Sequence, residues 1–227
     1  TLLTRVDLAY WIGQAGDTQR AQEEAAAVAE DMTRVLGPDH RHTLFARGGV
    51  VRWTALSGDF LRARELATAL DEDAQRVLGA DDPYILLGRA QLARWTGEAG
   101  DLCRARELTA AVVEDTQRVL GADDRYTLAA RALLVRWTGQ AGDVEGAREL
   151  AAALVEDDER VLGAGHRHTL LARGDLAHWT GEAGDVVRAG ELAATLIEDM
   201  VRTFGHDHPD TRAAQMRLAK WIKNNEG

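Results

Sequence analysis

The chain has 227 residues, 45% of them hydrophobic, and a formal net charge of −10 at pH 7. A protein that binds free nucleic acid normally carries a basic balance, so this class is disfavoured, and the longest apolar runs are far too short to span a bilayer. A single cysteine, Cys103, excludes an internal disulfide and favours a reducing, cytoplasmic setting. No secretory leader is visible. Because the sequence starts at Thr1 inside a repeat and without Met, we expect it to be a piece of a longer protein.

Tryptophan marks the organisation of the chain, because it occurs six times at a constant interval of 42 residues. A fixed period of this length indicates stacked copies of one supersecondary unit. The Gly16-Asp17 pair and Ala21 recur in the same frame. The tryptophans are Trp11, Trp53, Trp95, Trp137, Trp179 and Trp221. We divide the chain, as one domain over 1–227, into the units 1–42, 43–84, 85–126, 127–168 and 169–210 and a partial sixth unit, 211–227.

The second unit shows what each copy folds into. Residues 43–56 carry apolar residues at helical spacing, and Gly58 ends this helix because glycine readily adopts the left-handed conformation. Asp59 follows and is placed to cap the amino terminus of a second helix, which we expect over 60–78. Pro83 then fits the first turn of the next helix. Each unit is therefore predicted to be a pair of helices joined by a tight turn.

Stacked helix-turn-helix units predict an all-α fold, an α-solenoid with eleven helices. We interpret the partial unit 211–227 as a cap, with its helix at about 210–224, since polar residues there replace the apolar residues of other units. The Trp column is interpreted as structural, with each ring buried against the adjacent unit. The alanine column, including Ala63, is expected where the two helices of a pair approach most closely. Cys103 is expected to be a buried, inert thiol.

Four recurring features identify the kind of repeat. They are the Gly16–Ala21 spacing, the Leu8-Ala9 pair, the phrase ValLeuGlyProAspHis at 35–40 and the phrase TrpThrGlyGluAlaGlyAsp at 95–101 and 179–185. The first three resemble tetratricopeptide repeats (TPRs) of the 42-residue kinesin-light-chain type. The fourth resembles the repeats that follow NB-ARC nucleotide-binding modules in actinobacterial regulatory proteins. The resemblance implies a right-handed superhelix that serves as a protein-binding scaffold. Such repeats often carry a peptide-contacting Asn before the Leu-Ala pair; that column here holds Asp7, Gly49, Gln91, Leu133, Asp175 and Arg217.

The sequence offers little catalytic or metal chemistry. It has no GxxxxGK[ST] phosphate loop, so any nucleotide switch lies outside this chain. Histidine pairs between the units lack a third ligand at a standard spacing, and we expect adventitious metal binding only. They are His40 and His42, His166 and His168, and His206 and His208. Carboxylate pairs such as Glu30-Asp31 recur in every unit, which argues for structure rather than catalysis. We expect the chain to have no enzymatic activity and to bind no cofactor.

A column of arginines is expected to be structural, because it lies toward the partner helices, where an unpaired charge is costly. From antiparallel packing across the loop between units, we expect each arginine to pair with a carboxylate of the preceding unit. The predicted pairs are Arg89 with Glu72 or Asp73, Arg131 with Glu114 or Asp115, and Arg173 with Glu156 or Asp157.

Three other columns of the first helices are predicted to line the inner, concave surface of the repeat array. One is largely apolar: Leu3, Phe45, Leu87, Ala129, Leu171 and Ala213. One is small: Val6, Gly48, Ala90, Ala132, Gly174 and Met216. The third is mostly basic: Tyr10, Arg52, Arg94, Arg136, His178 and Lys220. A solvated arginine explains any one of these positions, whereas several cations in register on one face favour a binding role.

These columns lead to one favoured function and two alternatives. We interpret the chain as a non-enzymatic scaffold that binds an acidic or carboxylate-bearing peptide or protein segment in its concave groove. The predicted binding residues are Phe45, Arg52, Leu87, Arg94, Arg136, Leu171 and His178. The first alternative is a ligand-sensing repeat arm of a larger nucleotide-switched signalling protein of the NB-ARC or STAND type. The second is a structural array that self-associates through its repeat ends.

Overall fold

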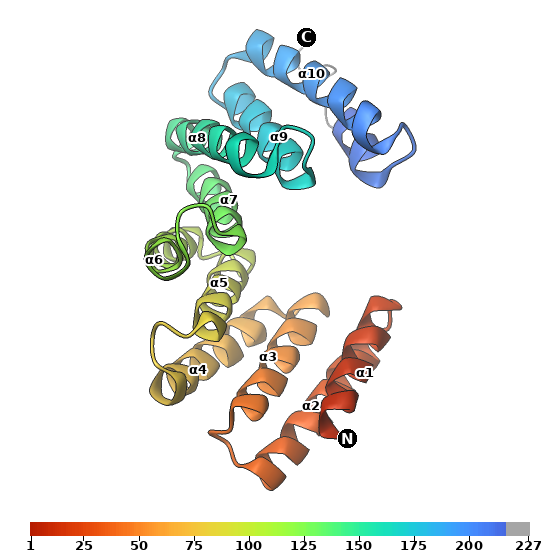
Figure 1. Ribbon diagram of the computed structural model, residues 1–227, viewed down its shortest axis with the longest axis vertical. Coiled ribbons are helices and arrows are strands. Elements are labelled where there is room, and N and C mark those ends of the chain that lie inside the picture. The colour runs from red at the N-terminus through yellow and green to blue at the C-terminus, as the bar shows by residue number, and fades with distance from the viewer. Residues whose placement is uncertain (217–227) are drawn as a thin grey trace. The chain divides into compact units, whose positions relative to one another are not determined.

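The computed structural model describes residues 1–216, and within this range every regular element is a helix (Figure 1). The complete helices are α1 (Leu2–Gln14), α2 (Thr18–Leu36), α3 (Arg41–Leu56), α4 (Phe60–Leu78), α5 (Pro83–Glu98), α6 (Leu102–Leu120), α7 (Arg125–Gln140), α8 (Val144–Leu162), α9 (Arg167–Glu182) and α10 (Val186–Phe204). An eleventh helix begins at residue 209 and is described as far as residue 216. The all-α repeat fold is confirmed. The rest of the predicted cap, including Lys220 and Trp221, lies outside the described residues.

The helices belong to two compact units, Thr1–Asp115 and Thr116–Gly227, each of which is described by itself. In the first unit, each helix from α1 to α4 packs against the next one in the chain. In the second unit, α7 to α10 pack in the same consecutive manner. The organisation of the whole chain as one continuous solenoid stays a prediction.

A Gly-Asp turn joins the two helices of each repeat, as the sequence predicted. Gly58 has a φ of 95°, in the left-handed region that favours glycine. The Asp59 side chain accepts a hydrogen bond of 3.0 Å from the backbone N–H of Arg62 and so caps α4. The observed bounds of α4, Phe60–Leu78, match the predicted range. The sequence therefore determines both the end of one helix and the start of the next.

The first helix of each repeat has a different cap, which explains part of the histidine pattern. Asp82 caps α5 by accepting from the backbone N–H of Tyr84 at 2.8 Å, and Pro83 lies in the first turn. At the equivalent position before α3, the His40 Nδ1 atom accepts from the backbone N–H of His42 at 3.1 Å. The first histidine of a pair thus replaces a capping aspartate. Within residues 1–216, no three His, Cys, Asp or Glu side chains gather in a way that could hold a metal ion.

The tryptophan rings fill the space between successive repeats. The Trp53 ring lies directly on Gly13 of α1, where no side chain would fit, and only 3% of Trp53 is exposed. Trp179 packs on Gly139 in the same way. Trp53 and Trp179 are thus buried against a neighbouring repeat, whereas Trp11 of α1 is 66% exposed in the described part of the chain. The alanine column is confirmed, since Ala63 is completely buried.

The arginine column pairs with carboxylates, but with different ones from those predicted. The pairs are Arg47 with Asp73 (2.8 Å), Arg89 with Asp115 (3.1 Å) and Asp71 (3.2 Å), Arg131 with Asp157 (2.5 Å) and Arg173 with Asp199 (2.7 Å). The prediction placed each pair across the loop between units. Except for the additional Asp71 contact, each pair instead joins the two helices of one repeat, with the carboxylate 26 positions after the arginine.

The prediction that Cys103 is buried is also wrong, because its side chain is exposed near the start of α6. The same column holds Leu61 and Val187, which are exposed as well. The position two residues before the buried alanine column therefore faces solvent in these second helices. Among the described residues, none of the helices combines the length and apolarity needed to cross a bilayer.

Candidate functional site

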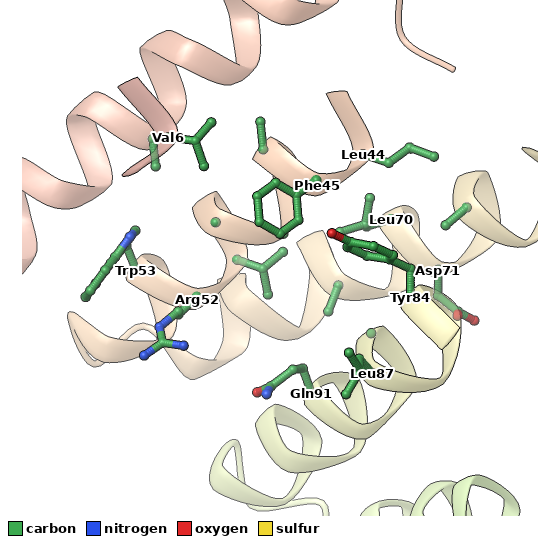
Figure 2. Close-up of a pocket in the computed structure, with 18 of the residues that line it drawn as sticks. Val6, Leu44, Phe45, Arg52, Trp53, Leu70, Asp71, Tyr84, Leu87 and Gln91 are labelled. Carbon is green, nitrogen blue, oxygen red and sulfur yellow. The ribbon is translucent and has the colours of Figure 1, made fainter. Parts of the chain in front are cut away.

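The first unit contains a pocket of about 550 Å³ that is lined by three of the predicted binding residues, Phe45, Arg52 and Leu87. Phe45 and Arg52 come from α3, and Leu87 comes from α5. Figure 2 shows their side chains around the same space, together with Tyr84 and Gln91 of α5. The pocket thus lies between the first helices of consecutive repeats, on the face that the sequence predicted to be concave.

The pocket is deeper than a surface groove because second helices contribute to its wall. Leu70, Ala74 and Leu78 of α4 line it as well as residues of α3 and α5. One side is aromatic: the rings of Phe45 and Tyr84 meet edge to face, with centroids 5.6 Å apart. An occupant would therefore contact apolar surface from both layers of helices.

Two of the four charged residues that line the pocket are already paired. Arg41 contacts Asp82 at 3.3 Å and lies 4.9 Å from the centre of the Tyr84 ring. Asp71 contacts Arg89 at 3.2 Å. Arg52 is different: its guanidinium lies over the rings of Tyr10 (5.6 Å) and Trp53 (5.5 Å), and it forms no ion pair with any residue in 1–216.

Asp7 of α1 also lines the pocket and forms no ion pair within residues 1–216. The charges left over among the lining residues are therefore one cation, Arg52, and one anion, Asp7. Both side chains are exposed, so both are accessible to a bound molecule.

The other predicted binding residues are not among those that line this pocket. Arg94 of the first unit is exposed, and its guanidinium lies 5.0 Å from the centre of the Trp95 ring. In the second unit, Arg136 lies 4.5 Å from the ring of Trp137, and the His178 ring lies 4.5 Å from that of Trp179. Leu171, also of the second unit, is 38% exposed. The basic column thus has a structural contact that sequence reasoning missed: each cationic or imidazole side chain covers the tryptophan that follows it.

Several lining residues were not predicted, although the sequence contained a signal for some of them. Asp7, Gly49 and Gln91 come from the column in which related repeats often carry a peptide-contacting asparagine, and all three line the pocket. The sequence gave no such signal for Tyr84, because the equivalent position is histidine in two of the first four units and tyrosine in the other two.

A separate polar cluster lies in the second unit, between α8 and α9. The Asp158 carboxylate is fully buried, and its Oδ2 atom lies 2.6 Å from the Nδ1 atom of His168. Its Oδ1 atom has no hydrogen-bond partner within the described part of the chain. The equivalent positions in the other repeats are Met32, Ala74, Thr116 and Met200, so this carboxylate is particular to one repeat.

Comparisons with known proteins identify the fold class. Neither a protein-family model nor a curated protein matches the sequence. Among solved structures, the TPR-like repeats of a kinesin light chain from Podosopora anserina are 25% identical, with a TM-score of 0.80 over 89% of this chain and 95% of that one. BtubC from P. vanneervenii is 16% identical, with a TM-score of 0.69 over 98% and 84% of the two chains.

A third similar structure is a signal transduction ATPase with numerous domains (STAND) that has a TPR sensor, from Pyrococcus horikoshii. It is 11% identical, with a TM-score of 0.75, and the match covers 97% of this chain and 33% of that one. The chain therefore has a TPR-like helical repeat fold, similar to that of kinesin-light-chain repeats and of a STAND sensor.

Proposed function

We propose that the chain is a non-enzymatic protein-interaction scaffold that binds a segment of another protein at the pocket of the first unit. The observation that carries the proposal is the pocket itself, where Phe45 and Leu87 offer apolar surface near Arg52. Apolar contacts would supply most of the affinity. The Arg52 guanidinium, which has no acidic partner within residues 1–216, would set the register of the bound segment.

The partner that fits this chemistry is an acidic or carboxylate-bearing peptide or protein segment. An arginine presents a planar fork that binds a carboxylate with two parallel hydrogen bonds. We propose Arg94 of the first unit, and Arg136, Leu171 and His178 of the second, as further contacts for the partner. We propose neither a nucleic acid nor a membrane as the partner, since the net charge is −10. The proposed setting is the cytoplasm.

A second candidate function is that of a ligand-sensing arm in a larger nucleotide-switched protein. Two observations favour it: one of the similar structures is a STAND protein with a TPR sensor, and the pocket has the volume of a small-molecule site, about 550 Å³. Sequencing the complete gene would test this candidate, which requires a nucleotide-binding module in the same polypeptide. Self-association through repeat ends is tested by light scattering over a concentration series.

The scaffold proposal is tested with pools of acidic and basic peptides, whose binding is measured at low and high salt. We expect the acidic pool to bind and the binding to weaken with salt, because screening at physiological ionic strength limits the field to about 8 Å. Arg52→Glu is expected to reduce the binding about tenfold or more. Arg94→Glu, at the equivalent position outside the pocket, is expected to have a smaller effect. Preferential binding of basic peptides, or equal effects of the two variants, would contradict the proposed site.

A further inference from the structure

A glycine in the middle of α5 lines the pocket without being required by helix packing. A Cβ atom added to Gly88 would meet no other atom within 4 Å. Gly13 is the opposite case, since the ring of Trp53 occupies the space that its side chain would need. A glycine inside a helix destabilises the helix by about 1 kcal/mol relative to alanine. The free protein would therefore be more stable with alanine at residue 88.

Among the equivalent positions, residue 88 is the only glycine, and the first repeat has Thr4 there. The second, fourth and fifth repeats have Ala46, Ala130 and Ala172, which are 1%, 4% and 2% exposed. Their methyl groups are packed into the protein, whereas the position of the missing methyl group at Gly88 is open. Two glycines of α3, Gly48 and Gly49, line the same pocket and would make only ordinary contacts with an added Cβ, at 3.9 and 4.0 Å. Packing requires none of the three residues to be glycine.

The open space is apolar and large enough for a small molecule. Its volume of about 550 Å³ falls within the range of about 300–1,000 Å³ that is typical of ligand pockets. Leu70 and Leu78 of α4 line it together with Phe45 of α3 and Leu87 of α5, and Figure 2 labels three of them. A long apolar body can therefore enter between α3 and α5 and reach α4.

The charges around the pocket restrict the polar part of such a ligand. Arg52 can donate hydrogen bonds to one carboxylate, since its present partners are two aromatic rings. Asp7 also lines the pocket and would repel a second acidic group. We propose that the pocket binds a small amphiphile with an apolar body and a single carboxylate, such as a medium-chain fatty acid. This second binding activity goes beyond the scaffold function and does not depend on it.

The test measures the binding of hexanoate, octanoate and decanoate to the whole chain by calorimetry, below the concentrations at which they form micelles. Each methylene that enters the pocket should strengthen the binding about fourfold, which corresponds to about 0.8 kcal/mol per buried CH₂. Decanol and decyltrimethylammonium, which lack the carboxylate, should bind at least tenfold more weakly than decanoate. A chain-length series without this preference for the carboxylate would overturn the proposal.

Variants locate the binding and separate it from effects on folding. Gly88→Leu fills the open space and should abolish decanoate binding while the melting temperature stays equal or rises. Arg52→Gln should weaken decanoate binding about tenfold, Arg94→Gln should leave it unchanged, and Asp7→Asn should strengthen it. Unchanged binding in Gly88→Leu would overturn the proposal, because it would reveal detergent-like adsorption elsewhere.

The outcome is distinguishable from that of the scaffold test. If decanoate binds as expected but no acidic peptide does, the scaffold proposal fails and the amphiphile site stands. If the peptides bind but decanoate does not bind the wild-type chain, the amphiphile site fails alone.

Discussion

The buried side chain of Asp158 depends on His168 for its side-chain hydrogen bond. We expect His168→Phe to destabilise the second unit strongly, because it removes the only side-chain partner that the described residues provide for a fully buried carboxylate. Leaving a buried polar group without its hydrogen-bond partner costs about 1–3 kcal/mol. The lower end of this range applies here, since the His168 side chain is 27% exposed and water reaches one member of the pair.

The opposite substitution should behave differently. Asp158→Thr removes the buried carboxylate and leaves His168 in contact with solvent, so we expect it to cost less than about 1 kcal/mol. Adding His168→Tyr reproduces the combination of Thr116 and Tyr126 in the preceding repeat. The double variant should therefore be as stable as the wild type or more stable, which makes the two substitutions strongly non-additive.

The assay is equilibrium unfolding in urea, with the change in stability obtained from the midpoint at constant slope. His42→Phe serves as the control, because His42 occupies the equivalent position in the first repeat and forms no ion pair within the described part of the chain. A cost below about 0.5 kcal/mol for His168→Phe would show that the buried Asp158 side chain does not depend on His168. Equal costs for His168→Phe and Asp158→Thr would contradict the expected asymmetry between the two partners.

Two further predictions concern stability. Trp53→Ala should cost about 3–5 kcal/mol, whereas Trp11→Ala should change stability by less than about 1 kcal/mol, because Trp11 is 66% exposed; similar costs in urea unfolding would contradict the packing. Hydrogen bonds from Arg47 and Arg76 lower the pKa of Asp73 from its ordinary value of 3.8. The carboxylate therefore contributes its full stabilisation at pH values above its pKa in the unfolded chain. This stabilisation disappears as the pH falls through the pKa of the carboxylate in the folded protein. Asp73→Asn should reduce the loss of stability below about pH 4, measured by unfolding across a pH series. An unchanged dependence of stability on pH in the acidic range would contradict this prediction.

The helix boundaries could be predicted because they depend on local chemistry. Gly58 and Asp59 act through their own backbone conformation and through a hydrogen bond to a residue three positions away, and both effects are visible in the sequence. The burial of Trp53 was predictable for another reason. A bulky residue repeated at a fixed interval must meet the same neighbour in each copy.

The partners of the arginine column could not be predicted by the same reasoning. Each arginine faces two antiparallel helices, one before it and one after it, and the sequence places a carboxylate at a suitable distance in both. Arg89 shows the ambiguity directly, since it contacts Asp71 of the preceding repeat and Asp115 of its own. Only the rotation of the helices about their axes decides between such partners, and the repeat period contains no information about that rotation.

The pocket could not be predicted from the repeat pattern because departures from that pattern help to form it. Phe45 and Leu87 belong to a column that the period reveals, but the open space beside them depends on Gly88, in a column that holds buried alanines in three other repeats. A glycine in place of an alanine at one position does not disturb the 42-residue pattern, so a search for repeats gives it no significance. Its meaning depends on what surrounds it, since at Gly13 a tryptophan ring takes up the space and at Gly88 nothing does. In this chain the period therefore identifies the repeat fold, whereas a position that breaks the period without a packing reason, Gly88, lies where we propose that a ligand binds.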